Sequence, residues 1–302
     1  MQELLDKLGV NINVAFHLIF VGLIWVRCLM MASVVPFLFG KPVPRYVVVG
    51  TSMVLAFYAY PHLVPAAPPH IADPLNLVML FLKEIFYGLI LGFSASVIFY
   101  AFEGVGQMID NQRGVSIARL IIPQLGEMGS ISGSFLLQFS IVLYLAIGGH
   151  RQFLEAFFGS YRALPVLEYP VIEAGMVPLL DLFVRITGEL FFVAIQLAAP
   201  VIIAIFIADI ILGIANRIAP QINVWELGFN VKGFVGILLL AVSITMIADQ
   251  MEKYTLRSTE HVTEAIGHLQ KKIPPPKLPE LPPEEGLLKP EKGPPPVTNL
   301  PQ

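Results

Sequence analysis

The chain has 302 residues, of which 56% are hydrophobic and only 14% are charged. Charged residues make up about a quarter of an ordinary soluble domain, so the composition excludes that class and predicts a surface that mostly avoids water. The formal net charge of −3 gives no basic field that would attract nucleic acid. The single cysteine, Cys28, excludes an internal disulfide and is expected to be a packed thiol.

Six apolar runs follow one another along the chain, and a helix needs about 20 residues to cross a bilayer. Two runs are too short for an ordinary crossing, and the fifth is too long unless it bends, for which Pro200 is the candidate hinge. We therefore predict an all-α, integral membrane protein built of helical hairpins packed within an assembly. The runs cover residues 14–39, 46–60, 75–102, 135–148, 177–215 and 229–248.

The third run begins at a strong helix start, because Asp73 can cap the helix and Pro74 suits its first position. Within this run, Gly88 and Gly92 form a pair of small residues four apart, which lets another helix approach closely. We interpret this pair as a packing contact.

Residues 103–134 interrupt the apolar pattern with many glycines and serines, which predicts a flexible segment. Non-helical backbone at membrane depth is tolerated only inside protein or along a wet cavity, so this stretch is a candidate pore element. The alternative is an exposed surface loop. Asp110 and Arg113 lie three residues apart and can form an ion pair if this part is helical.

Asp181, Arg185 and Glu189 lie four residues apart in the fifth run and share one face of an apolar helix. Ionisable side chains in lipid cost about 3 kcal/mol each, so these residues should face protein or water. A salt bridge within the helix or between subunits explains them, and a substrate pathway is the alternative. Other charges inside apolar runs or at their ends are Arg27, Lys83, Glu84, Asp209 and Lys232.

A polar turn separates the last two apolar runs and predicts a tight helical hairpin. Pro220 ends the incoming helix, and Asn223 followed by Glu226 forms a capping-box variant that starts the next one. After this hairpin, residues 256–270 form a candidate amphipathic segment. Eleven prolines from Pro274 onward then forbid a helix, so we expect a disordered tail.

Two strings carry a resemblance to a known family: the hairpin turn from Asn216 to Lys232, and Ile109-Asp-Asn-Gln-Arg-Gly114. Both resemble the bacterial type III export-gate family, called FliR in flagella and SctT in virulence injectisomes, and the second string is more similar to the injectisome branch. By this resemblance, residues 1–176 would correspond to the P/R-type gate subunit and residues 177–255 to the Q/S-type subunit.

The resemblance implies a structural and gating subunit of a helical export gate in the bacterial inner membrane, at the base of a secretion or flagellar basal body. Its partners would be P/R-type and Q/S-type subunits, the export-switch subunit (FlhB or SctU) and unfolded secreted proteins. Pore plug candidates are Arg113, Gly114, Gly126, Met128, Gly129 and Gly133. Candidates for partner contact at the hairpin tip are Arg217, Pro220, Gln221, Asn223, Glu226 and Lys232. The predicted intramembrane polar network consists of Asp110, Asp181, Arg185, Glu189 and Asp209.

Two other function classes remain open at this stage. An independent secondary transporter would place ionisable groups at broken helices, but the sequence contains no visible inverted repeat. An intramembrane enzyme would need a catalytic motif, and neither a phosphate-binding loop nor a His-Glu-x-x-His pattern occurs. The six histidines are scattered, so we expect no metal and no cofactor.

Overall fold

The computed structural model describes residues 14–39, 43–65, 73–115, 129–169, 172–221 and 223–270. In these ranges the chain forms helices and no strand, which confirms the predicted all-α class. The helices are α2 (Val14–Val34), α3 (Arg45–Leu63), α4 (Pro74–Gln112), α7 (Ile131–Ala146), α8 (Gly149–Ala163), α9 (Ile172–Ile218) and α10 (Val224–Leu269).

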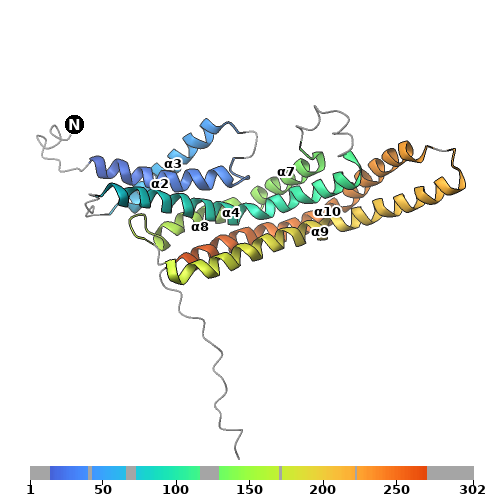
Figure 1. Cartoon of the computed structure of the whole chain (residues 1–302). Helices are drawn as coiled ribbons and strands as arrows, with labels where there is room; N and C mark the ends of the chain where they lie inside the picture. Colours follow the sequence, from blue (N-terminus) through green and yellow to red (C-terminus); the bar gives the residue numbers. More distant parts are fainter. Residues whose placement is uncertain are drawn as a thin grey trace, which may run out of the picture. The chain divides into compact units, whose positions relative to one another are not determined.

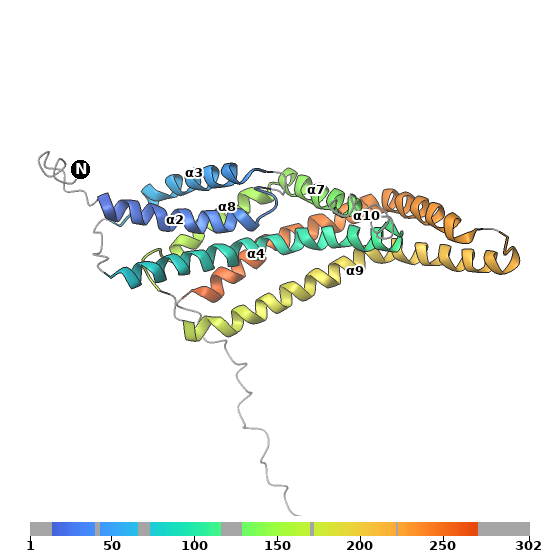
Figure 2. The same cartoon turned by 45° about the horizontal axis from the view of Figure 1, so that its top comes forward.

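Helices α2, α4, α7 and α8 surround the main aromatic core. Phe37 lies 4.7 Å from Tyr144 and 5.1 Å from Phe153, measured between ring centroids, and Phe99 packs on the same group. Helices α9 and α10 run side by side as a long hairpin that packs on α4 and extends past its end (Figures 1 and 2). Tyr144 of this core lies 3.5 Å from the hydroxyl of Thr259 on α10, and the outer part of the hairpin has exposed apolar side chains on both helices.

The glycine pair on α4 makes a close contact with α2, as the spacing predicts. A Cβ atom at Gly88 would lie 2.6 Å from the carbonyl oxygen of Arg27, and one at Gly92 would lie 3.1 Å from that of Met31. The start of α4 also follows the prediction, since the Asp73 side chain accepts a hydrogen bond from the amide of Leu75 at 3.1 Å.

The flexible segment predicted over 103–134 is wrong at both ends. Helix α4 continues to Gln112, and α7 begins at Ile131. Gly106 and Gly133 serve close packing and not flexibility, because a Cβ atom at Gly106 would lie 2.2 Å from the backbone nitrogen of Gly133 on α7. The middle of the segment, residues 116–128, lies outside the described residues.

The last two helices are longer than the apolar runs indicate. Helix α9 continues through both Pro178 and Pro200 without interruption. Helix α10 reaches Leu269, so the amphipathic segment from 256 onward is its continuation and not a separate helix. The reason is local, since neither proline nor a cluster of glycines occurs between Lys253 and Leu269 to end the helix.

Five described helices are long and apolar enough to cross a membrane: α2, α3, α4, α9 and α10. Helices α7 and α8 pass the same test as a pair but are bent by 77° at their junction. Gly148 occupies this junction with a φ of +78°, a left-handed conformation that favours glycine. The fourth apolar run is therefore part of a bent pair, in agreement with its short length.

Candidate functional site

A buried carboxylate joins the end of α4 to the start of α7. Asp110 is 2% exposed and accepts hydrogen bonds from the hydroxyl of Ser130 at 2.6 Å, the hydroxyl of Ser132 at 2.6 Å and the amide of Ser132 at 3.0 Å. The guanidinium of Arg113 donates a fourth bond at 3.1 Å, which confirms the predicted ion pair. We call Asp110, Arg113, Ser130 and Ser132 the polar clamp.

The polar clamp joins the last turn of α4 to the first turn of α7, on the two sides of residues 116–128. Gly114, one residue past Arg113, has a φ of +85°, which turns the chain out of α4. On the other side, the Ser130 hydroxyl accepts a hydrogen bond from the amide of Gly133 and caps α7. One carboxylate therefore joins the described residues on the two sides of 116–128.

The clamp also touches the hairpin. A Cβ atom at Gly236 of α10 would lie 2.5 Å from Cδ of Arg113, and one at Gly114 would lie 2.8 Å from the ring of Phe229. Neither Gly236 nor Phe229 was among the site residues predicted from the sequence. A glycine inside an apolar run was the only signal for the first, and it does not indicate which helix approaches.

The plug candidates are in different settings. Arg113 belongs to the polar clamp, Gly114 follows the end of α4 with a positive φ, and Gly129 lies just before the cap residue Ser130. Gly133 is in the first turn of α7, where it packs against the backbone of Glu103. Gly126 and Met128 lie outside the described residues.

The hairpin turn has the predicted capping. The side chain of Asn223 accepts from the amide of Glu226 at 3.4 Å and donates to its carboxylate at 3.2 Å. Helix α9 ends at Ile218, and Pro220 lies in the exposed turn that follows. The other tip candidates differ in exposure, because Arg217 and Gln221 are exposed whereas Lys232 is half-buried in an ion pair.

The predicted polar network is not one network in the described structure. Lys232 pairs with Asp209 across the hairpin at 2.6 Å. Farther toward the hairpin base, Arg185 pairs with Glu264 of α10, and Glu189 lies 3.3 Å from the imidazole of His261. Asp181 is exposed, and Asp110 belongs to the polar clamp. Thus Arg185 and Glu189 connect α9 to α10. Their spacing in the sequence indicated only that they share one face of their own helix.

A buried charged cluster forms where α2, α4 and the end of α8 meet. Arg27 makes two hydrogen bonds to the carboxylate of Glu84, at 2.5 and 3.0 Å, and both side chains are fully buried. The ammonium of Lys83 lies 2.9 Å from the same carboxylate and donates to three backbone carbonyls, those of Pro165, Val166 and Glu168. We call Arg27, Lys83 and Glu84 the buried triad.

The sequence showed these three charges within apolar runs but gave no indication that they meet. Arg27 also donates to the carbonyl of Leu164 at 2.9 Å, so the two cations together bind four carbonyls of the chain that follows α8. The triad therefore fastens the segment that leads into α9 to α2 and α4.

Comparisons of the sequence with known proteins identify several relatives. The chain is 34% identical over 219 residues to "Yop proteins translocation protein T" of Yersinia pestis, covering 72% of this chain and 82% of that protein. It is 27% identical over 225 residues to "Flagellar biosynthetic protein FliR" of Bacillus subtilis, covering 74% and 86%. It is 31% identical over 172 residues to "Surface presentation of antigens protein SpaR" of Shigella flexneri, covering 57% and 65%.

The family model described as "Bacterial export proteins, family 1" matches residues 18–258. This range begins in the second turn of α2, includes all of α3, α4, α7, α8 and α9, and ends within α10. Both strings on which the resemblance rests lie within this range. The chain therefore belongs to bacterial export protein family 1, the family of FliR and its injectisome counterparts.

Proposed function

We propose that this chain is a structural and gating subunit of a type III protein export channel in the bacterial inner membrane, at the base of a secretion or flagellar basal body. Residues 1–176 would take the place of a P/R-type subunit and residues 177–255 that of a Q/S-type subunit in a helical assembly with those partners. Membership of a family of export proteins supports this proposal, together with five helices able to cross a membrane.

The observation that carries the gating role is the polar clamp. A plug must move or deform at its centre while its base stays attached to the channel wall. Asp110 is suited to hold such a base, because one buried carboxylate receives four hydrogen bonds from both ends of the loop. The loop between the two ends would then close the pore against ions and make way for unfolded substrate.

Removing the loop but keeping the clamp tests the gate. Deletion of 116–128, with two glycines joining the ends, leaves Asp110, Arg113, Ser130 and Ser132 in place. We expect cells that carry the assembled apparatus to leak small ions across the inner membrane, measured as potassium efflux. Replacing the same residues by a glycine–serine segment of equal length is the matched control for loss of chain length. Unchanged efflux in the deletion variant would indicate an exposed surface loop.

The hairpin tip would contact the export-switch subunit. Its exposed apolar residues support a protein partner, since Trp225 is 67% exposed and Phe234 is 69% exposed. The polar side chains of Arg217 and Gln221 are also exposed at the turn.

Exchanging the charges of Lys232 and Asp209 distinguishes two roles of Lys232, contact with the partner subunit and stabilisation of the hairpin. Lys232→Glu is expected to abolish secretion, although loss of the half-exposed pair with Asp209 costs only about 1 kcal/mol of stability. Adding Asp209→Lys restores an ion pair inside the hairpin but presents inverted charges to the partner, so secretion should stay low. Secreted protein in the culture medium is the measurement. Full recovery in the double variant would assign Lys232 to hairpin stability alone.

A further inference from the structure

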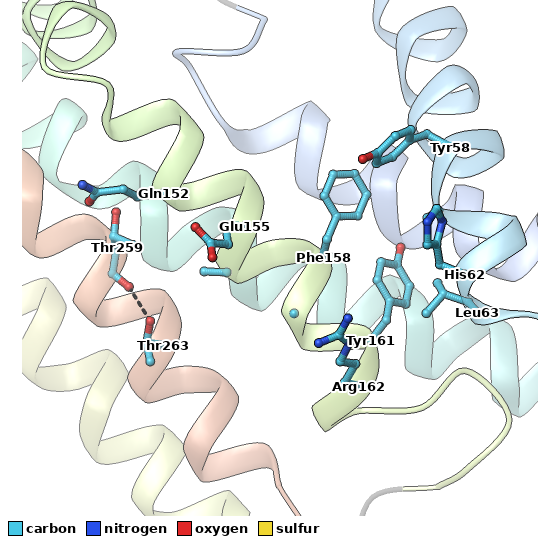
Figure 3. A pocket seen from close by; sticks show the side chains of 13 residues that line it. Tyr58, His62, Leu63, Gln152, Glu155, Phe158, Tyr161, Arg162, Thr259 and Thr263 are labelled. Atoms are coloured by element: carbon cyan, nitrogen blue, oxygen red, sulfur yellow. Dashed lines mark hydrogen bonds between the residues drawn. The ribbon is translucent and has the colours of Figure 1, made fainter.

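A groove of about 760 Å³ lies between α3, α8 and α10, apart from the polar clamp and the hairpin tip (Figure 3). Its volume is within the range of about 300–1,000 Å³ that is typical of small-molecule sites. All three helices contribute side chains, α8 the largest share. None of the roles proposed above uses this groove.

The lining of the groove combines aromatic, polar and charged side chains. In the view of Figure 3, the rings of Tyr58, His62 and Phe158 gather at one end, and the polar side chains of Gln152 and Thr259 lie at the other. The rings of Tyr58 and Phe158 are 5.7 Å apart between centroids and meet edge to face. The rings of Tyr58 and Phe158 can hold the apolar part of an amphiphile, and the charged side chains of Arg162 and Glu155 in the same lining can hold its polar part.

Charges of both signs line the same groove without ion-pair partners among the described residues. Arg162 and Glu155 are both exposed on α8, seven residues apart, which corresponds to about 10 Å along the helix. Their flexible side chains can approach each other over this distance. The groove therefore offers a guanidinium for a phosphate and a carboxylate for an ammonium group.

The surface beside the groove is apolar. Helix α3, which forms one wall, is apolar enough to cross a membrane and only 17% of its span is buried. Val54 is 66% exposed and Phe57 is 54% exposed on this helix. A ligand in the groove would thus have an apolar surface next to it on which hydrocarbon chains can lie.

We propose that this groove binds phosphatidylethanolamine, a phospholipid with one phosphate and one primary ammonium group. Arg162 binds the phosphate, Glu155 binds the ammonium group, and the acyl chains lie against Tyr58, Phe158 and the outer face of α3. An anionic phospholipid is disfavoured, because it lacks a cation for Glu155 and leaves that carboxylate near the phosphate. The proposal does not depend on the gating role.

Native mass spectrometry of the full chain, extracted in mild detergent with any subunits that copurify, tests this assignment. Phosphatidylethanolamine or phosphatidylglycerol is added at equal concentrations, and bound lipid is read as added mass. We expect Arg162→Gln to weaken the binding of both lipids about tenfold. Glu155→Gln should weaken the binding of phosphatidylethanolamine to a similar extent. Phosphatidylglycerol should bind to this variant as well as to the unchanged chain, or better. This difference in sign identifies the ammonium contact.

Two matched controls accompany the test. Arg151→Gln removes an exposed cation from the same helix outside the groove and should leave binding unchanged. Gly159 lines the groove and a Cβ atom there meets no atom within 4 Å, so Gly159→Trp should fill the groove and abolish binding. Gly188→Trp, at an equally open position on α9, should not.

Three results of the mass spectrometry would overturn the proposal. They are absence of bound phosphatidylethanolamine on the unchanged chain, equal loss of lipid in Arg151→Gln and Arg162→Gln, and equal responses of the two lipids to Glu155→Gln. A photo-crosslinker at Gly159 that captures a copurifying subunit in place of lipid would show that a protein fills the groove, and would likewise refute the lipid.

Discussion

Glu84→Gln is expected to lower the free energy of unfolding by about 3–5 kcal/mol, because it leaves Arg27 and Lys83 buried without a compensating charge. Loss of one partner of a buried ion pair is among the most destabilising single changes. Unfolding of the purified chain in detergent, followed by circular dichroism against denaturant concentration, measures this difference.

Glu252→Gln is the matched control for the triad, since Glu252 is an exposed carboxylate on α10. Its free energy of unfolding should differ from that of the unchanged chain by no more than about 0.5 kcal/mol. If Glu84→Gln were as stable as this control, the buried triad would contribute nothing to the stability of the fold.

Asp110→Ala is expected to release the base of the loop. It removes the acceptor of four hydrogen bonds and leaves Arg113, which is 13% exposed, without its carboxylate. We expect a loss of about 3 kcal/mol at the junction of α4 and α7. Hydrogen exchange of the backbone amides of 130–135, followed by mass spectrometry, should then be about a hundredfold faster.

Asp110→Asn keeps the shape and one acceptor oxygen, so its amides should exchange at rates between those of Asp110→Ala and the unchanged chain. Asp181→Ala, which removes an exposed carboxylate from α9, should change nothing in this segment. Protection of 130–135 that survives Asp110→Ala would mean that packing of Gly133 against α4 holds the junction without the carboxylate.

Features that depend on neighbouring residues were predictable from the sequence. The caps at Asp73 and Asn223 occur as predicted, because a side chain that caps a helix needs only a partner two or three residues away. The close approach at Gly88 was likewise indicated by spacing alone. These contacts position the helix ends and one helix crossing.

Pairings between distant segments were not predictable. Arg27 and Glu84 are 57 residues apart, and Arg185 and Glu264 are 79 residues apart. Helical periodicity places a charge on one face of its helix but does not specify which helix covers that face. The same limit explains the error over 103–134, where glycines that allow α4 and α7 to touch have the same composition as a flexible loop.

The length of the hairpin determines its surroundings. Helix α10 has 46 residues and is therefore about 69 Å long. The hydrocarbon layer is about 30 Å thick, and even a helix tilted by about 40° would span about 53 Å along the bilayer normal. A large part of the hairpin must consequently stand in water or among other protein chains. The exposed apolar residues on that part cannot all be covered by lipid, so an isolated copy would be prone to aggregate.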